Sequence, residues 1–133
     1  MKVILAGCRC ITGSNELTAA IRESGFEITE VVCGEARGVD ALGRWWAGQH
    51  SIPVASFPAD WDRDGRSAGY LRNVRMAEYA DALIAVWNNK SPGTRHMIQT
   101  AREKGLKVYI HLVSRTNAVI AAKKFVVGED VEK

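Results

Sequence analysis

The segment Lys2–Ala6 is apolar after its first residue and ends at Gly7. A strand without alternating polar residues is typical of a parallel sheet that is covered on both faces. Further short apolar runs follow at residues 28–33, 53–57, 82–87 and 106–112. We therefore expect five strands in a mostly parallel sheet, with more strands not excluded.

Apolar residues recur at helical spacing between these runs, as at Leu17, Ala20 and Ile21 before Gly25. Three more helices are expected at residues 40–50, 70–80 and 94–104. Residues 58–69 hold one proline, two glycines and three aspartates, and we expect a loop there. Strands that alternate with helices of about ten residues predict βαβ units, and therefore an α/β fold in three layers.

A chain of 133 residues is expected to form one domain. We assign residues 1–112 to this domain. Residues 113–133 form an extension that either belongs to the same domain or frays. Within it, residues 118–127 fit a short helix or a strand.

The composition, 47% hydrophobic and 25% charged, excludes wholesale disorder. The net charge of +3 permits a nucleic-acid partner but does not require one. No apolar run approaches the roughly 18 residues of a membrane span. The first apolar stretch is too short for a signal peptide, so we expect a cytoplasmic protein with no membrane partner.

The three cysteines, Cys8, Cys10 and Cys33, are an odd number, which excludes a complete disulfide framework and fits a reducing compartment. A metal site would need a fourth ligand and CxxC-like spacing, and neither is visible. Buried free thiols are therefore favoured, and no metal is expected.

The aspartates of residues 60–64, followed by Gly65, resemble the start of a calcium loop. The position of the bidentate glutamate holds Leu71, so calcium binding is disfavoured. An acidic, solvated loop that orients Arg63 or Arg66 is the favoured interpretation.

The loops that follow the expected strands are rich in glycine and polar residues, whereas the loops that precede them are short. Ligands of open parallel sheets bind at the carboxyl ends of the strands. Glycine lets backbone N–H groups approach an anion, and the next helix adds a positive end. Arg9, Arg37 and Arg95 lie in or beside these loops and can grip a phosphate. The pattern predicts a phosphate-bearing small molecule, with plain tight turns as the alternative.

Residues 88–111 carry five basic residues against Glu103 alone. This stretch is either a solvated helix face or part of an anion site. The second interpretation needs a helix start that contains glycine, which Pro92-Gly93-Thr94 provides.

Common nucleotide fingerprints are missing. The residues after Gly7 lack the second and third glycines of the dinucleotide motif, and the chain has no Gly-Lys-Ser or Gly-Lys-Thr. An ordinary NAD site and a P-loop are therefore disfavoured, and no cofactor is expected.

Several motifs, in order along residues 1–112, resemble the YspA-like branch of the SLOG superfamily. They are Gly7-Cys8-Arg9, residues 34–40 (GEARGVD), residues 57–61 (FPADW), residues 69–76 (GYLRNVRM), residues 80–85 (ADALIA) and residues 91–94 (SPGT). The resemblance implies a single Rossmann-like domain that binds a nucleotide or a nucleotide-derived ligand. It also implies kinship with the lonely-guy phosphoribohydrolases and with the DNA-processing protein DprA.

The resemblance transfers only part of the hydrolase machinery. In the phosphoribohydrolases an arginine lies nine positions before a strand-initiating aspartate, and Arg72 and Asp81 keep this spacing. Their glycine-rich loop is reduced to residues 91–94, and their acid position holds Met97. Methionine cannot position water by accepting a proton, so catalysis is uncertain. Arg72 and Glu35 remain candidate catalytic residues.

Taken together, the strand-end pattern and the resemblance give a set of candidate ligand-binding residues. They are Gly7, Cys8, Arg9, Gly34, Glu35, Ala36, Arg37, Gly38, Asp40, Asp60, Trp61, Arg72, Asn73, Trp87, Ser91, Gly93 and Thr94. We expect Gly93 and Thr94 to hold a phosphate, and Arg72 and Asn73 to reach in from the third helix.

Some of these residues have structural alternatives. Asp40 and Thr94 can be helix caps, and Trp61 and Trp87 can either stack on a base or pack in the core. Trp45 and Trp46 are adjacent on one expected helix and therefore point in different directions. We expect one of them in the core and the other partly exposed at a subunit contact.

Three functions remain open. The leading one is a sensor or sequestering domain for a nucleotide-derived small molecule. The alternatives are a phosphoribohydrolase or N-glycosidase acting on a nucleotide, and DprA-like binding of single-stranded nucleic acid. Relatives of the SLOG type commonly self-associate, which implies a homo-oligomer.

Overall fold

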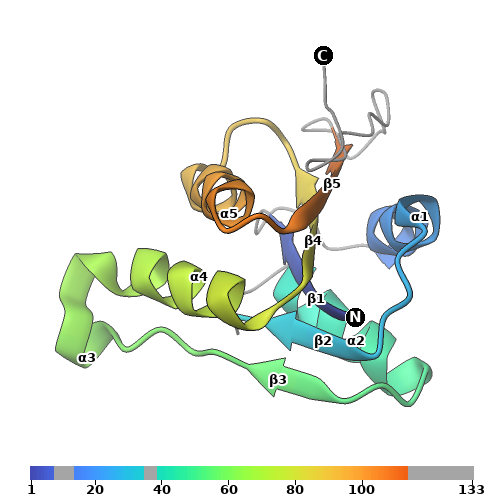
Figure 1. Cartoon of the computed structure of the whole chain (residues 1–133), viewed down its shortest axis with the longest axis horizontal. Helices are drawn as coiled ribbons and strands as arrows, with labels where there is room; N and C mark the ends of the chain where they lie inside the picture. The colour runs from blue at the N-terminus through green and yellow to red at the C-terminus, as the bar shows by residue number, and fades with distance from the viewer. Residues whose placement is uncertain (8–13, 35–38, 114–133) are drawn as a thin grey trace.

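Five parallel strands form the sheet in the computed structural model, which describes residues 1–7, 14–34 and 39–113. The strands are β1 (Lys2–Gly7), β2 (Glu30–Cys33), β3 (Val54–Ser56), β4 (Ala82–Trp87) and β5 (Lys107–Leu112). Their order is β3-β2-β1-β4-β5, and every neighbouring pair is parallel (Figure 1). The expected parallel sheet is confirmed.

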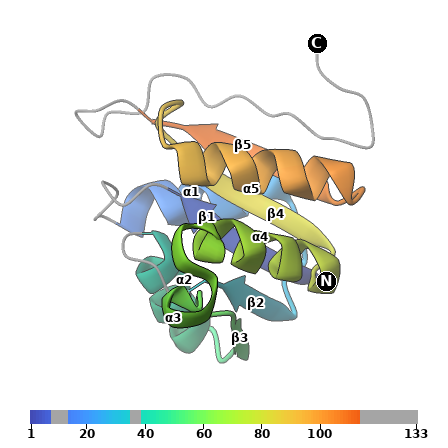
Figure 2. The same ribbon diagram turned by 90° about the vertical axis from the view of Figure 1, so that its left-hand side faces the viewer.

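Helices cover both faces of this sheet. They are α1 (Ser14–Ser24), α2 (Val39–Gln49), α3 (Trp61–Asp64), a 3-10 turn η1 (Gly65–Ser67), α4 (Ala68–Tyr79) and α5 (Pro92–Glu103). Figure 2 shows α4 and α5 in front of the sheet and α1 and α2 behind it. The three-layer, Rossmann-like α/β fold is therefore confirmed.

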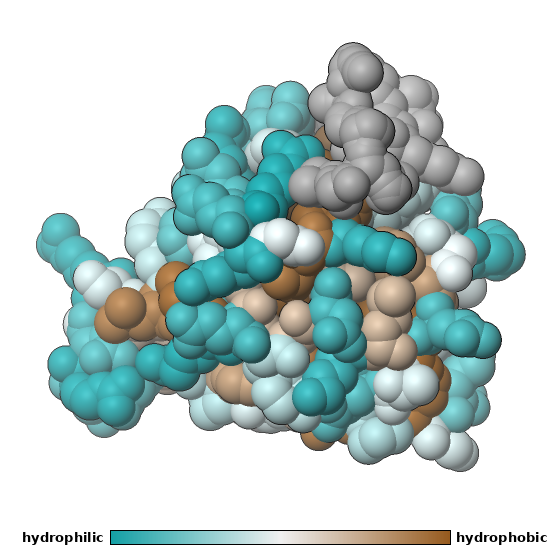
Figure 3. All heavy atoms as spheres, in the orientation of Figure 1, coloured by the Kyte–Doolittle hydropathy of each residue, from teal (hydrophilic) through white to brown (hydrophobic). Residues whose placement is uncertain are grey.

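The strands bury side chains on both faces, as their continuous apolar sequence requires. Val3 and Leu5 pack toward α1 and α2, whereas Ile4 packs toward α4 and α5, and all three are fully buried. Each such side chain contributes roughly 1.5–3 kcal/mol when it leaves water. On the face drawn in Figure 3, hydrophilic side chains cover much of the surface, with hydrophobic patches between them.

One expectation for the backbone is wrong. Residues 58–69, expected to be a loop, contain α3, η1 and the start of α4. Asp60 is the N-cap of α3, and its Oδ1 accepts the N–H of Arg63 at 3.1 Å. Aspartate and glycine are favoured in turns and also at helix ends, so composition alone did not separate the two structures.

The paired tryptophans of α2 lie as expected. Trp46 is buried in the core behind the sheet, and Trp45 is 49% exposed. A subunit contact at Trp45 stays a prediction. Among the described residues, no helix is long and apolar enough to cross a membrane. Residues 114–133, with the expected element at 118–127, lie outside the described part.

The strand order places a crevice beside β1. From β1 the chain moves outward through β2 to β3, and then returns to the other side of β1 with β4. Connections that leave neighbouring strands in opposite directions open a crevice at the carboxyl ends of those strands. Gly7 and Val86 pair at this position.

Gly7 is required here by close packing. A Cβ atom on Gly7 would lie 2.3 Å from the carbonyl oxygen of Val86 and 2.6 Å from Cγ2 of Val39. The missing side chain therefore lets the start of α2 approach the end of β1 and form one wall of the crevice.

Candidate functional site

A cavity of about 320 Å³ opens at this carboxyl edge, which is in the range of small-ligand sites. Eight of the candidate residues line it: Gly7, Asp40, Trp61, Arg72, Asn73, Ser91, Gly93 and Thr94. They come from β1, α2, α3, α4 and the start of α5, so elements distant in sequence converge on one site.

The other candidates lie elsewhere or outside the described residues. Gly34 adjoins the cavity through Arg72, whereas Trp87 and Asp60 do not line it. The indole Nε1 of Trp87 donates to the carbonyl of Ser91 at 3.2 Å, and this ring packs against the core in front of the sheet. The candidates outside the described part are Cys8, Arg9, Glu35, Ala36, Arg37 and Gly38.

The start of α5 faces the cavity. Ser91 is the N-cap, and its hydroxyl accepts the N–H of Thr94 at 3.5 Å. The alternative role of Thr94 as the cap of this helix is therefore wrong, because Thr94 is the third residue of the helix. Pro92 has no N–H, so Gly93 carries the first backbone N–H that a helix start directs outward.

The side chain of Asn88 fixes the loop before α5. Oδ1 of Asn88 accepts the backbone N–H groups of Lys90 and Ser91 at 2.9 and 3.0 Å. The cap residue is thereby held in place, and the N-terminus of α5 is set at the cavity before any ligand arrives.

Arg72 connects the front helix layer to the end of β2. Its Nη1 donates to the carbonyl of Gly34, and its Nε donates to Oδ1 of Asn73 at 3.2 Å. A Cβ atom on Gly34 would lie 2.4 Å from Nη1 of Arg72, so the guanidinium occupies the space over this glycine. Arg72 thus has a structural role as well as a cavity position.

Asn73 connects α4 to α5. Its buried Nδ2 donates to Nδ1 of His96 at 3.1 Å and lies 3.4 Å from the carbonyl of Gly93. Since Nδ1 of His96 accepts, the ring proton is on Nε2, 3.4 Å from the hydroxyl of Thr100. Burial lowers the pKa of His96 below its usual value, opposed by the charge of Glu103, which favours this neutral ring.

Asp40 is not the N-cap of α2, because it is the second residue of that helix. The carboxylate is buried, and its Oδ2 accepts the N–H of Gly34 at 3.1 Å. The expected capping role is therefore wrong. Asp40 instead fixes the residue that follows β2, which is also the residue that Arg72 binds.

The cavity has one carboxylate among the described lining residues, that of Asp40. Met97, at the position of the hydrolase acid, also lines the cavity and is buried. Its thioether has no proton to transfer. Among the described residues, no group of three His, Cys, Asp or Glu side chains is placed to hold a metal ion.

Sequence reasoning missed part of the lining. The additional residues are Ala6, Arg66, Gly69, Tyr70 and Met76, together with Met97. Two of these, Arg66 and Gly69, lie in the segment expected to be a loop. Tyr70 precedes Asn73 by three residues, so helical spacing puts both on one face and is the signal that could have found it.

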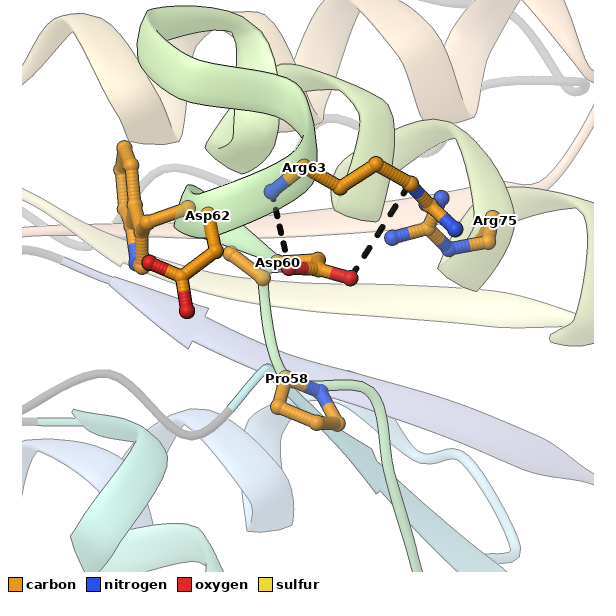
Figure 4. A pocket seen from close by; sticks show the side chains of 7 residues that line it. Pro58, Asp60, Asp62, Arg63 and Arg75 are labelled. Carbon is orange, nitrogen blue, oxygen red and sulfur yellow. Dashed lines mark hydrogen bonds and ion pairs between the residues drawn. The ribbon is translucent and has the colours of Figure 1, made fainter.

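A second, more open hollow lies beside α3 and is lined by Asp60, Arg63 and Arg75, among others (Figure 4). Nε of Arg63 lies 2.9 Å from Oδ1 of Asp64 and 3.9 Å from Oδ2 of Asp60. The hydrogen bond from Arg63 lowers the pKa of Asp64. The expectation that this acidic segment orients Arg63 is confirmed.

The basic residues of 88–111 do not form one patch. Lys90 and Arg95 are exposed near the start of α5, whereas Lys104 and Lys107 are exposed beyond its other end. Arg95 and Lys104 are nine positions apart along α5 and its C-cap, roughly 14 Å along the axis. This distribution resembles a solvated helix more than a continuous nucleic-acid surface.

Comparison with known proteins gives a family. The model of the YspA, cpYpsA-related SLOG family matches residues 1–63, from β1 into α3. The chain belongs to this family. Membership of the SLOG family supports a role in binding or modifying a nucleotide-related ligand in general.

One relative is the Gene 61 protein of Mycobacterium phage D29. It is 38% identical over 84 residues, which cover 59% of the present chain and 67% of the phage protein. No solved structure matches this SLOG chain significantly. The cavity residues of α4 and α5 lie beyond the segment that the family model matches.

Proposed function

We propose that this SLOG protein is a binding domain for a nucleotide or nucleotide-derived ligand, with its phosphate at the start of α5. The observation that carries the proposal is the shared cavity: Gly93 and Thr94 at a helix N-terminus face the same space as Arg66 and Arg72. Backbone N–H groups and guanidinium groups are the usual partners of phosphate.

The charge balance of the cavity favours an anion. Among the described lining residues, two arginines and the N-terminus of α5 are positive, and the helix N-terminus alone is equivalent to roughly half a positive charge. Asp40 carries the one carboxylate among these described residues. That carboxylate already accepts the N–H of Gly34. A phosphate therefore gains attraction from the arginines and meets little opposing charge.

Binding is favoured over hydrolysis because the described lining residues include no acid at the position that the hydrolase resemblance assigns to it. Hydrolysis of an N-glycosidic bond needs a group that stabilises the developing positive charge or activates water. Met97 can do neither, and the carboxylate of Asp40 already accepts the backbone N–H of Gly34. We therefore infer a sensor or sequestering role.

Arg66 offers a clean test because it is exposed and lines the cavity. Isothermal calorimetry with adenosine 5′-monophosphate is expected to show binding to the native protein. Arg66→Ala should weaken it roughly 10- to 100-fold, the loss of one charge-assisted hydrogen bond. Arg102→Ala, the same change at the far end of α5, is the control and should leave the affinity unchanged. Equal losses in both variants would refute the site.

Hydrolysis is tested separately by chromatography of the same nucleotide after long incubation at high protein concentration. The proposal expects intact nucleotide and no free base. Release of base by the native protein, abolished by Asp40→Asn, would replace the binding role with a hydrolase.

A further inference from the structure

Two aromatic side chains are exposed on the wall of the cavity formed by α3 and α4. Trp61 is 57% exposed and Tyr70 is 48% exposed, and both line the cavity. Large apolar rings left in water at a concave site are characteristic of ligand contacts rather than of folding. The second of these residues was not among the candidates that the sequence suggested.

Tyr70 is held as a flat platform. Its ring stacks on the imidazole of His96, with centroids 4.2 Å apart and planes inclined by 20°. His96 is in turn fixed by the hydrogen bond from Asn73 at 3.1 Å. One face of Tyr70 is therefore covered, and the exposed half of the side chain offers the other face to the cavity.

Trp61 lies beside this platform. A Cβ atom on Gly69 would be 3.7 Å from Cη2 of Trp61, so the six-membered ring of the indole lies close to the first turn of α4. More than half of the Trp61 side chain remains exposed at this wall of the cavity.

The platform lies about one helical turn from Asn73, which contacts the proposed phosphate site at the start of α5. Tyr70 precedes Asn73 by three residues on α4, about 5 Å along the axis, and Asn73 contacts the carbonyl of Gly93. Tyr70 and Gly93 line the same cavity, so one mononucleotide could contact both residues. Arg66 and Arg72 also line this cavity.

We propose that Tyr70, backed by His96 and flanked by Trp61, is the subsite that binds the nucleobase of the ligand. This inference rests on the proposed phosphate site and adds that the ligand carries an aromatic base, which a sugar phosphate lacks. Stacking of a base on an aromatic side chain contributes about 1–3 kcal/mol and tolerates different bases.

Calorimetry with adenosine 5′-monophosphate, cytidine 5′-monophosphate and ribose 5-phosphate tests it. The native protein should bind both nucleotides more tightly than the sugar phosphate. Tyr70→Ala should weaken nucleotide binding roughly 5- to 150-fold and leave ribose 5-phosphate unaffected. Tyr70→Phe keeps the ring and should bind as the native protein does. Tyr79→Ala, at the other end of α4, is the control.

The outcomes separate the two proposals. If ribose 5-phosphate binds as tightly as the nucleotides, or if Tyr70→Ala weakens all three ligands equally, the base subsite is refuted and the phosphate site stands. If none of the three ligands binds the native protein, the phosphate site fails and the base subsite fails with it. Melting temperatures of the variants show whether a loss of binding reflects a loss of folding.

Discussion

Replacement of Gly34 by alanine tests how the end of β2 is joined to α4. A Cβ atom there would lie 2.4 Å from Nη1 and 2.9 Å from both Cδ and Cζ of Arg72. These distances are shorter than van der Waals contact, and the flexible arginine moves more easily than the backbone. We therefore expect Gly34→Ala to displace the guanidinium and break its hydrogen bond to the Gly34 carbonyl.

The magnitude follows from two opposing effects. A hydrogen bond from a charged group contributes about 1.5–3 kcal/mol. Alanine in place of glycine raises the unfolding free energy by about 0.4–1 kcal/mol, because it lowers the conformational entropy of the unfolded chain. The net loss of unfolding free energy for Gly34→Ala is therefore about 1–2 kcal/mol, measured as a lower urea midpoint at unchanged slope.

A double-mutant cycle isolates the cause. In a protein that already carries Arg72→Ala, the added methyl group meets no guanidinium, so Gly34→Ala should cost nothing or stabilise slightly. Gly48→Ala, where a Cβ atom meets nothing within 4 Å, is the control and should also stabilise. A loss of equal size with and without Arg72 would refute the reasoning and place the requirement for glycine in the backbone.

Two further changes probe the scaffold. Gly7→Ala should lower the unfolding free energy by about 1–3 kcal/mol in urea titrations, because its methyl group would lie 2.3 Å from the backbone oxygen of Val86; a loss no larger than that of Gly48→Ala would contradict this packing. Burial and a 2.6 Å hydrogen bond to Glu23 raise the pKa of Tyr109, so its stabilising contribution is full below about pH 10 and is lost at higher pH. Tyr109→Phe should therefore be less stable than the native protein at pH 7, and this difference should shrink above pH 10; a constant difference would refute the assignment.

Much of the fold was predictable because it depends on local patterns. The continuous apolar runs of β1 and β4 can be buried only in the middle of a covered sheet, and both strands lie there. Gly25, with φ of +73°, ends the first helical segment as the sequence indicated. The central strands and the three-layer arrangement were therefore predictable from sequence patterns only a few residues long.

The details of the site depend on contacts between distant residues, which local patterns do not contain. The sequence offered helix capping as a role for Asp40 and as an equal alternative for Thr94, but Asp40 binds Gly34 and the cap of α5 is Ser91. The pairing of Arg72 with Gly34 joins residues 38 positions apart, and no spacing rule predicts it. Tyr70 lies in a segment that the sequence predicted as a helix, but its position alone does not show that this side chain lines a cavity with residues of α3 and α5.

The most direct test of the account is an amide NMR titration with adenosine 5′-monophosphate. Binding at the carboxyl edge predicts that the largest shift changes fall at Gly93, Thr94 and residues 66–73. The loops at the opposite edge, residues 25–29 and 104–106, should not move. The largest changes at that opposite edge, or no changes at saturating nucleotide, would contradict the central claim.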